Sequence, residues 1–159
     1  MTDVEIGPAD ESHLDHIVRL QLELGRHHHT LDVENPRYLI AEKDWRAQIE
    51  ASLRDRSSQF LVAKFKDEVC GFVRVTMVEK PWGWSCEMDA LVVAEPVRDR
   101  GIGALLVEAA ERIARSMGAR AMRANVLLSN LRGREFYSTS GYAEIAVRFG
   151  KSLEESPNE

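Results

Sequence analysis

The stretch from residue 97 to residue 106, VRDRGIGALL, constrains this chain more than any other. It places Arg98, Arg100, Gly101 and Gly103 directly before a run of apolar residues at helical spacing. Glycine lowers helix propensity, and positive charge at a helix N-terminus opposes the helix dipole. Both choices become favourable when an anion binds there, because glycine lets the ligand approach the free backbone N–H groups closely. The stretch therefore predicts a strand-to-helix turn that binds a phosphate, and a tight turn with two solvated arginines is the alternative.

Two well-known phosphate-binding patterns do not fit this turn. A dinucleotide-binding turn needs a third glycine where the chain has Leu106, and a P-loop needs a Gly-Lys-Ser/Thr tripeptide that does not follow. A dinucleotide-binding protein is therefore disfavoured. The formal net charge of −5 gives no overall basic surface, so we expect no nucleic-acid partner.

Length and composition predict one globular domain. The chain has 159 residues, of which 44% are hydrophobic, and we expect a single domain over residues 1–151 with a disordered tail over residues 152–159. Cys70 and Cys86 fit no zinc or redox motif, and we interpret them as reduced cysteines of a cytoplasmic protein. We expect no membrane partner, because no apolar run approaches the roughly 18 residues of a membrane span and no secretory signal pattern is found.

Hydrophobic periodicity predicts a mixture of helices and strands. Helical spacing is found over residues 8–25, 38–54, 101–117 and 130–141, and strand patterns over residues 3–6, 59–65, 69–79, 85–93, 120–128 and 142–149. The three central strand patterns predict an antiparallel meander over residues 59–93. Gly25 is expected to end the first helix, and RHHHTLDVENP is expected to be a polar connection.

Two motifs in the second half of the chain carry a family resemblance. LVVAEPVRDRGIGALLVEAAERIARSMGA, followed by NLRGREFYSTSGY, resembles the GCN5-related N-acetyltransferase (GNAT) superfamily. The acetyl-CoA motif of that superfamily is Arg/Gln-x-x-Gly-x-Gly/Ala, which Arg98, Gly101 and Gly103 match. The downstream pattern Asn-x-x-Ala-x-x-Phe-Tyr ends here in Phe136-Tyr137. The specific resemblance covers residues 87–142.

The sequence departs from the pattern at two positions. Asp99 stands where the family often has glycine, and Gly133 stands where it usually has alanine. A carboxylate at position 99 would be repelled by a pyrophosphate unless its side chain points outward. Gly133 lowers helix propensity by roughly 1 kcal/mol and changes no chemistry that the sequence makes evident.

The resemblance implies a fold and an activity. The fold expected is α/β (α+β), with a mixed, mostly antiparallel central sheet flanked by about four helices. The activity expected is transfer of an acetyl group from acetyl-CoA to a primary amine, by direct attack on the thioester, in a homodimer. A small cationic molecule is the preferred acceptor and a peptide N-terminus the other. The alternative function is a non-catalytic acyl-CoA-binding sensor module of the same fold.

The resemblance also implies a set of cofactor-binding residues. Leu91 and Val93 are expected to offer backbone groups to the pantetheine arm, and the Val93 N–H to stabilise the oxyanion. The full set expected at acetyl-CoA is Leu91, Val92, Val93, Arg98, Asp99, Arg100, Gly101, Ile102, Gly103, Ala104, Asn130 and Tyr137.

Catalysis requires a base, because an amine with a pKa of about 10.4 is neutral in only about one molecule in 2,500 at pH 7. The resemblance makes Glu87 the first candidate, because its position, four residues ahead of Leu91 on the strand before the cofactor loop, is the one that the histone-acetylating branch of the family uses for its catalytic carboxylate. Asp89 points to the same side of that strand and is the alternative. Tyr137 matches the family tyrosine that protonates the leaving thiolate.

The segment between the first two helices often borders the acceptor site in this family. We therefore expect His28, His29, Asp32 and Trp45, together with Asp89, on the acceptor side. The run of three histidines at 27–29 invites a metal interpretation. Successive residues of a helix point about 100° apart and cannot converge on one ion, so we expect no metal.

Overall fold

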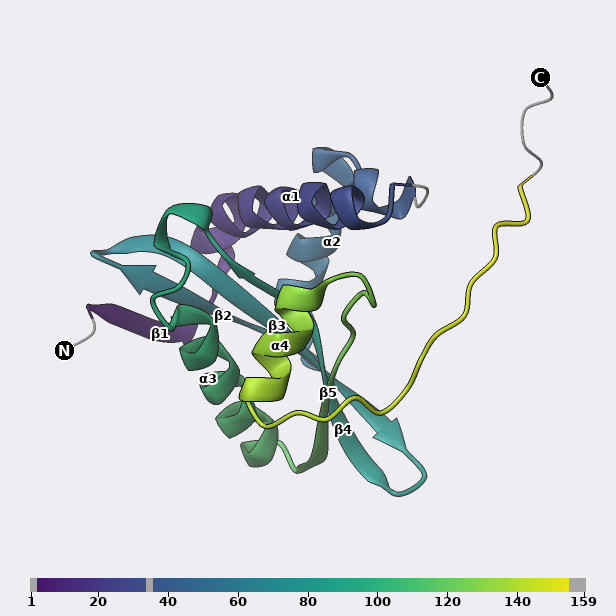
Figure 1. Ribbon diagram of the computed structural model, residues 1–159. Helices are drawn as coiled ribbons and strands as arrows, with labels where there is room; N and C mark the ends of the chain where they lie inside the picture. Colours follow the sequence, from purple (N-terminus) through teal and green to yellow (C-terminus); the bar gives the residue numbers. More distant parts are fainter. Residues whose placement is uncertain (1–2, 34–35, 155–159) are drawn as a thin grey trace.

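A computed structural model of the chain describes residues 3–33 and 36–154. Its core is a five-stranded sheet in the order β1-β2-β3-β4-β5, in which neighbours are antiparallel except for the parallel pair β4 and β5 (Figure 1). The strands are β1 (Val4–Pro8), β2 (Ser58–Phe65), β3 (Glu68–Lys80), β4 (Gly83–Val93) and β5 (Ala119–Ala124). This mixed, mostly antiparallel sheet confirms the expected fold class.

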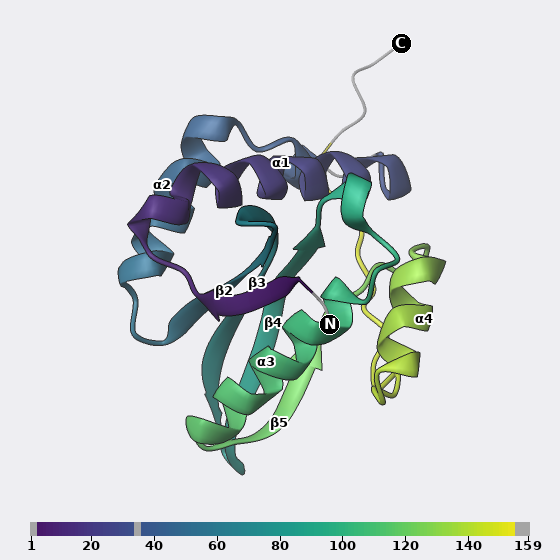
Figure 2. The same ribbon diagram turned by 90° about the vertical axis from the view of Figure 1, so that its left-hand side faces the viewer.

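Four α-helices cover the sheet on its two faces (Figure 2). One face carries α1 (Leu14–Leu31) and α2 (Glu42–Arg54), and the other carries α3 (Ile102–Ser116) and α4 (Leu131–Thr139). Short 3-10 turns complete the fold, namely η1 (Glu11–His13), η2 (Pro36–Leu39) and η3 (Glu95–Val97). No helix in the described parts of the chain has the length and apolar character needed to cross a bilayer.

Alternation along the strands builds two separate apolar layers. Successive strand residues point to opposite faces, so Phe72 packs under α1 and α2 while its neighbour Val73 packs under α3. Both side chains are completely buried. The sheet is thus sandwiched between two hydrophobic layers.

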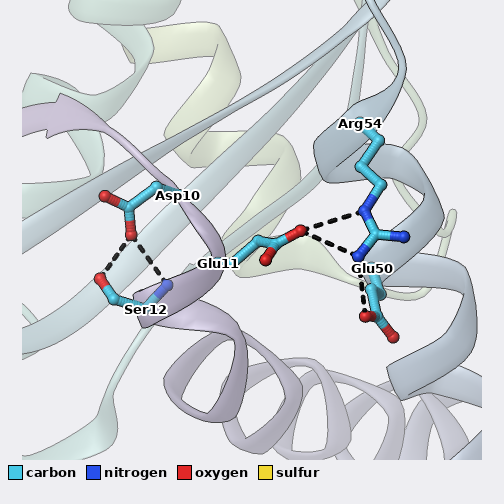
Figure 3. Close-up of polar contacts among 5 residues, drawn as sticks. All are labelled: Asp10, Glu11, Ser12, Glu50 and Arg54. Atoms are coloured by element: carbon cyan, nitrogen blue, oxygen red, sulfur yellow. Dashed lines mark hydrogen bonds and ion pairs between the residues drawn. The ribbon is translucent and has the colours of Figure 1, made fainter.

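A small polar network fixes the start of α1 beside the end of α2 (Figure 3). The Asp10 carboxylate accepts a hydrogen bond from the Ser12 N–H at 2.8 Å, and this contact caps η1. Arg54, in the last turn of α2, donates to Glu11 at 3.0 Å and to Glu50 at 3.2 Å. These contacts orient α1, which reaches the candidate site with its other end.

The first helix does not end at Gly25, contrary to the sequence expectation. It continues to Leu31, so the three histidines lie on a helix and not in a polar connection. Gly25 is needed for packing, because a Cβ atom there would lie 2.9 Å from the Tyr38 carbonyl oxygen. The second helix is also shorter than expected, because Tyr38 lies in η2 and α2 begins only at Glu42.

The predicted final strand over residues 142–149 is wrong. Residues 142–150 adopt neither helix nor strand, although their pattern is typical of a strand. A strand forms only when another strand supplies hydrogen-bond partners, and this segment lies against none. Strand β5 is likewise shorter than expected and ends at Ala124. Of the expected tail, residues 155–159 lie outside the described residues.

Candidate active site

The candidate site begins where β4 and β5 stop pairing. Their parallel register ends at Met88 and Ala124, while β4 continues to Val93. A bulge at Asp89 interrupts the pairing of β4 with β3 at the same level. The backbone of residues 89–93 is therefore paired on one side only, and its other side is available to a ligand that forms strand-like hydrogen bonds.

The turn after β4 has the backbone geometry of an anion site. Asp99 and Gly101 both adopt left-handed conformations, with φ of 63° and 78°. Aspartate tolerates this region better than most residues, and the geometry explains why a glycine suits position 99. Helix α3 then starts without a side-chain cap, so the N–H groups of its first turn are free to bind an anion.

The carboxylate of Asp99 is paired with a cation of α4. It accepts a hydrogen bond from Arg132 of α4 at 2.6 Å, and both side chains are largely exposed. The expected contact of residue 99 with acetyl-CoA stays a prediction. Arg132 was not identified from the sequence.

The two arginines of the turn differ in what they contact. Arg98 donates from Nε to the Val93 carbonyl at 2.9 Å and from Nη2 to the Glu23 carboxylate of α1 at 2.9 Å, so its charge is already paired. Arg100 lies over the Phe65 ring at 5.4 Å and forms no ion pair with the described residues. Arg98 therefore ties the turn to β4 and α1, and Arg100 supplies the unpaired charge.

Gly103 has a packing role that the sequence did not reveal. A Cβ atom at this position would lie 3.2 Å from the Phe136 ring of α4 and 3.9 Å from Val93. The glycine thus lets the start of α3 lie close to α4. Close approach of a phosphate, the reason expected from the sequence, stays a prediction.

We expect Gly103→Val to lower both stability and acetyl-CoA affinity. The added side chain overpacks against Phe136 and costs roughly 1–3 kcal/mol. Gly103→Ala is the graded control, because it adds only the Cβ atom and leaves out the two methyl groups that would press on Phe136. Thermal unfolding and calorimetric titration with CoA measure the two effects. Equal unfolding free energies in the two variants would contradict the packing role.

The two candidate carboxylates have different surroundings. Glu87 faces Thr76 on β3 and Arg123 on β5 in the sheet register, yet it makes no hydrogen bond or ion pair with the described residues. Arg123 instead lies over the Trp82 ring at 5.6 Å. Asp89 accepts a hydrogen bond from Thr76. Glu87 is therefore the carboxylate left free to accept a proton.

Asp89 is further held by a nearby cation. Its carboxylate lies 3.8 Å from Arg74, which also donates to Ser58 at 3.1 Å. This network fixes the bulge of β4. The geometry gives Asp89 a structural task at the point where β4 leaves β5.

Asn130 begins α4 and explains the unusual glycine that follows. Its side-chain oxygen accepts a hydrogen bond from the Gly133 N–H at 2.9 Å, which caps the helix. A Cβ atom on Gly133 would lie 2.6 Å from the Asn130 amide nitrogen. Glycine at 133 thus accommodates the capping side chain. The expected contact of Asn130 with the pantetheine arm stays a prediction.

Tyr137 sits among aromatic rings on α4. Its ring lies 5.2 Å from Phe136 and 5.5 Å from Tyr142, both edge to face. Burial raises the pKa of Tyr137 from 10.0 to about 12. The phenol is protonated at neutral pH with or without this shift, and the higher pKa makes transfer of its proton to a thiolate less favourable.

The end of α1 lies beside the start of α4. Ser129 donates to the Leu31 carbonyl at 3.3 Å, next to Asp32, which caps α1. His28 and His29 occupy the last turn of α1. The structure thus brings these acceptor-side candidates to the α4 end of the site.

Two further acceptor-side candidates, His29 and Trp45, have buried ring nitrogens. The Nδ1 atom of His29 is buried without a hydrogen-bond partner, and so is Nε1 of Trp45. Trp45 packs into the apolar layer under α1 and α2, so it is more a core residue than a surface one. Within residues 3–33 and 36–154, no three His, Cys, Asp or Glu side chains gather as a metal site would require.

Comparison with known proteins shows which family the chain belongs to. Residues 21–142 match the Acetyltransferase (GNAT) family, and the chain belongs to it. The chain is 29% identical over 138 residues to an aminoalkylphosphonate N-acetyltransferase of Salmonella typhimurium LT2, a match that covers 80% of this chain and 90% of that protein.

Solved structures share the fold at low identity. A possible acetyltransferase from Clostridium difficile 630 superposes with a TM-score of 0.79 at 18% identity, covering 96% of this chain and 99% of that one. The aminoglycoside N-acetyltransferase AAC(6')-Iy, solved in complex with CoA, gives 0.74 at 17% identity over 94% of this chain and 95% of that one. The resemblance stated from two motifs is thereby confirmed.

Proposed function

We propose that the protein transfers an acetyl group from acetyl-CoA to the primary amine of a small cationic molecule. The observation that carries this proposal is the unpaired Glu87 at the level where β4 parts from β5. A sensor of the same fold needs neither a free base there nor a protonated tyrosine on α4. These two residues therefore favour an enzyme over a binding module.

The chain's own residues fit acetyl-CoA. The free N–H groups at the start of α3 and the unpaired charge of Arg100 suit a pyrophosphate, and the one-sided backbone of residues 89–93 suits the amides of pantetheine. In this proposal the Val93 N–H stabilises the oxyanion. Arg98 acts through its bond to the Val93 carbonyl, which holds that backbone in place.

In the proposed reaction, Glu87 takes a proton from the acceptor ammonium, directly or through a water molecule. The neutral amine then attacks the thioester carbonyl carbon. The new C–N bond forms as the C–S bond breaks, the electron pair leaves with sulfur, and the nitrogen releases its second proton to solvent to give the neutral amide. Tyr137 donates its proton to that thiolate and is reprotonated from solvent, while the proton held by Glu87 is also released to solvent.

Charge supports a cationic acceptor. The chain carries a formal net charge of −5, and in this proposal Glu87 and Asp32 border the acceptor. On the cofactor side, the charge of Arg98 is offset by Glu23, which leaves Arg100 to meet the phosphates. The names of the relatives, aminoalkylphosphonate and aminoglycoside acetyltransferases, also point to small amines. We further expect a cytoplasmic homodimer.

Thiol release from acetyl-CoA tests the proposal over four acceptors: a diamine, an aminoglycoside, an aminoalkylphosphonate and a short peptide. For the cationic acceptors, we expect KM to rise at least about threefold between roughly 50 and 500 mM salt, because exposed charge attraction is screened. If the protein preferred the peptide and its KM did not change with salt, the acceptor would be a peptide N-terminus and not a small cation. CoA binding without turnover of any amine would favour the sensor.

A further inference from the structure

The carboxylate proposed as the base has a cation beside it on the neighbouring strand. Glu87 of β4 and Arg123 of β5 are opposite each other in the parallel register, so both side chains leave the same face of the sheet. Opposite charges on adjacent strands attract each other. In the described part of the chain, however, no ion pair joins these two side chains.

The Arg123 side chain contacts an aromatic ring instead. The central carbon of its guanidinium lies 5.6 Å from the centre of the Trp82 ring. Trp82 is in the turn between β3 and β4, just before Gly83, the first residue of β4. The indole therefore holds the guanidinium beyond ion-pair distance of the Glu87 carboxylate.

A second arginine fixes the turn that carries this indole. Arg120 of β5 donates from Nη1 to the Trp82 carbonyl oxygen at 3.0 Å. Gly83 makes room for the Arg120 side chain, because a Cβ atom at residue 83 would lie 2.8 Å from Arg120 Cδ. Gly83 also has a φ of 128°, a conformation that favours glycine. The backbone that carries the Trp82 ring is thus tied to β5.

The other polar groups around Glu87 already have partners. On β3 its register neighbour Thr76 donates a hydrogen bond to Asp89. Arg74 lies 3.8 Å from the same Asp89 carboxylate. Among the described residues, Arg123 is therefore the cation that faces Glu87 from an adjacent strand without being held by another carboxylate.

We propose that Trp82 is a positioning residue, whose ring holds the Arg123 guanidinium away from Glu87 and keeps that carboxylate free to take a proton. This inference rests on the proposed role of Glu87 as the base. A guanidinium paired with Glu87 would stabilise the charged carboxylate and occupy the place of the acceptor ammonium, and both effects would weaken the base. At a protein surface a cation–ring contact is about as strong as an ion pair, so one indole is enough to decide where the guanidinium lies.

Removing the ring tests the proposal through the rate. We expect Trp82→Ala to lower kcat/KM for a diamine by at least about fivefold, a part of the roughly 10²–10⁴-fold that a general base supplies. Trp82→Phe should keep most of the rate, because a phenyl ring also attracts a cation. Trp84→Ala is the matched control, since Trp84 is 43% exposed against 42% for Trp82 but is not the ring that Arg123 covers.

A second substitution separates positioning from a structural role. Arg123→Met removes the charge and keeps an unbranched side chain, so by itself it should change the rate little. Combined with Trp82→Ala, it should restore most of the lost rate, because no guanidinium is left to pair with Glu87. A double variant as slow as Trp82→Ala would overturn the proposal, since a rate lost through a damaged fold is not regained by a further substitution.

Titration of the Glu87 carboxyl distinguishes failure of this inference from failure of the proposed function. NMR follows its carboxyl carbon, whose signal is assigned by its absence in Glu87→Gln. In Trp82→Ala we expect the midpoint of this titration to fall by about 0.5–1 pH unit, because the carboxylate gains a cation. An unchanged midpoint would overturn the positioning role of Trp82. A lowered midpoint with an unchanged rate would support that role and contradict Glu87 as the base.

Discussion

Glu87→Gln should lower kcat/KM for an amine acceptor by about 10²–10³-fold, the range typical of losing a general base. The loss should be greatest at low pH, where the acceptor amine is most fully protonated. Binding of CoA should change little, because the carboxylate contacts none of the residues that form the α3 turn. Steady-state kinetics between about pH 6 and pH 10, with calorimetry for CoA, give both results.

Asp89→Asn is the matched control for that experiment. It makes the same chemical change two residues away, at a carboxylate that is already bonded to Thr76 and close to Arg74. We expect a smaller rate loss and an unchanged shape of the pH–rate profile. If Asp89→Asn altered the profile and Glu87→Gln did not, Asp89 would be the base.

Tyr137→Phe should lower turnover by about 10²-fold, because the thiolate loses its proton donor. Acetyl-CoA affinity should stay the same, since the ring keeps its contacts with Phe136 and Tyr142. Tyr142→Phe is the control, because it removes the hydroxyl of a neighbouring tyrosine. That hydroxyl already donates a hydrogen bond to Glu111. A full rate in Tyr137→Phe would remove the tyrosine from the mechanism.

The raised pKa of Tyr137 gives the same variant a second readout. In the unfolded chain the phenol ionises near 10, whereas burial in the folded state raises its pKa to about 12. The unfolded state therefore loses its proton first, and stability is lost as pH rises from 10 towards 12. Tyr137→Phe should make the alkaline loss of stability less steep, as urea unfolding at several pH values would measure.

Sequence alone predicts the parts of the site that depend on local patterns. The turn with Gly101 and the helix after it follow from residues adjacent in the chain, and so do the meander and α4. The resemblance placed Glu87 and Tyr137 on the elements where the structure has them. These features need no knowledge of distant contacts.

Features set by distant contacts could not be predicted. In the sequence Gly25 resembles a helix end. In the structure it lies within α1, where a Cβ atom would come too close to the Tyr38 carbonyl oxygen. Nothing in the sequence indicates that Arg98 pairs with Glu23, 75 residues away. The segment after Tyr142 has a strand pattern but no strand neighbour. In each case a tertiary contact, or its absence, outweighs the local signal.

Helix α1 touches both halves of the site. Through Glu23 it holds Arg98 and the turn beside the cofactor, and through Leu31 it meets Ser129 just before α4. In the proposed site, one helix therefore sets the spacing between the cofactor turn and the acceptor side. We expect substitutions along α1 that alter acceptor choice to change CoA affinity as well.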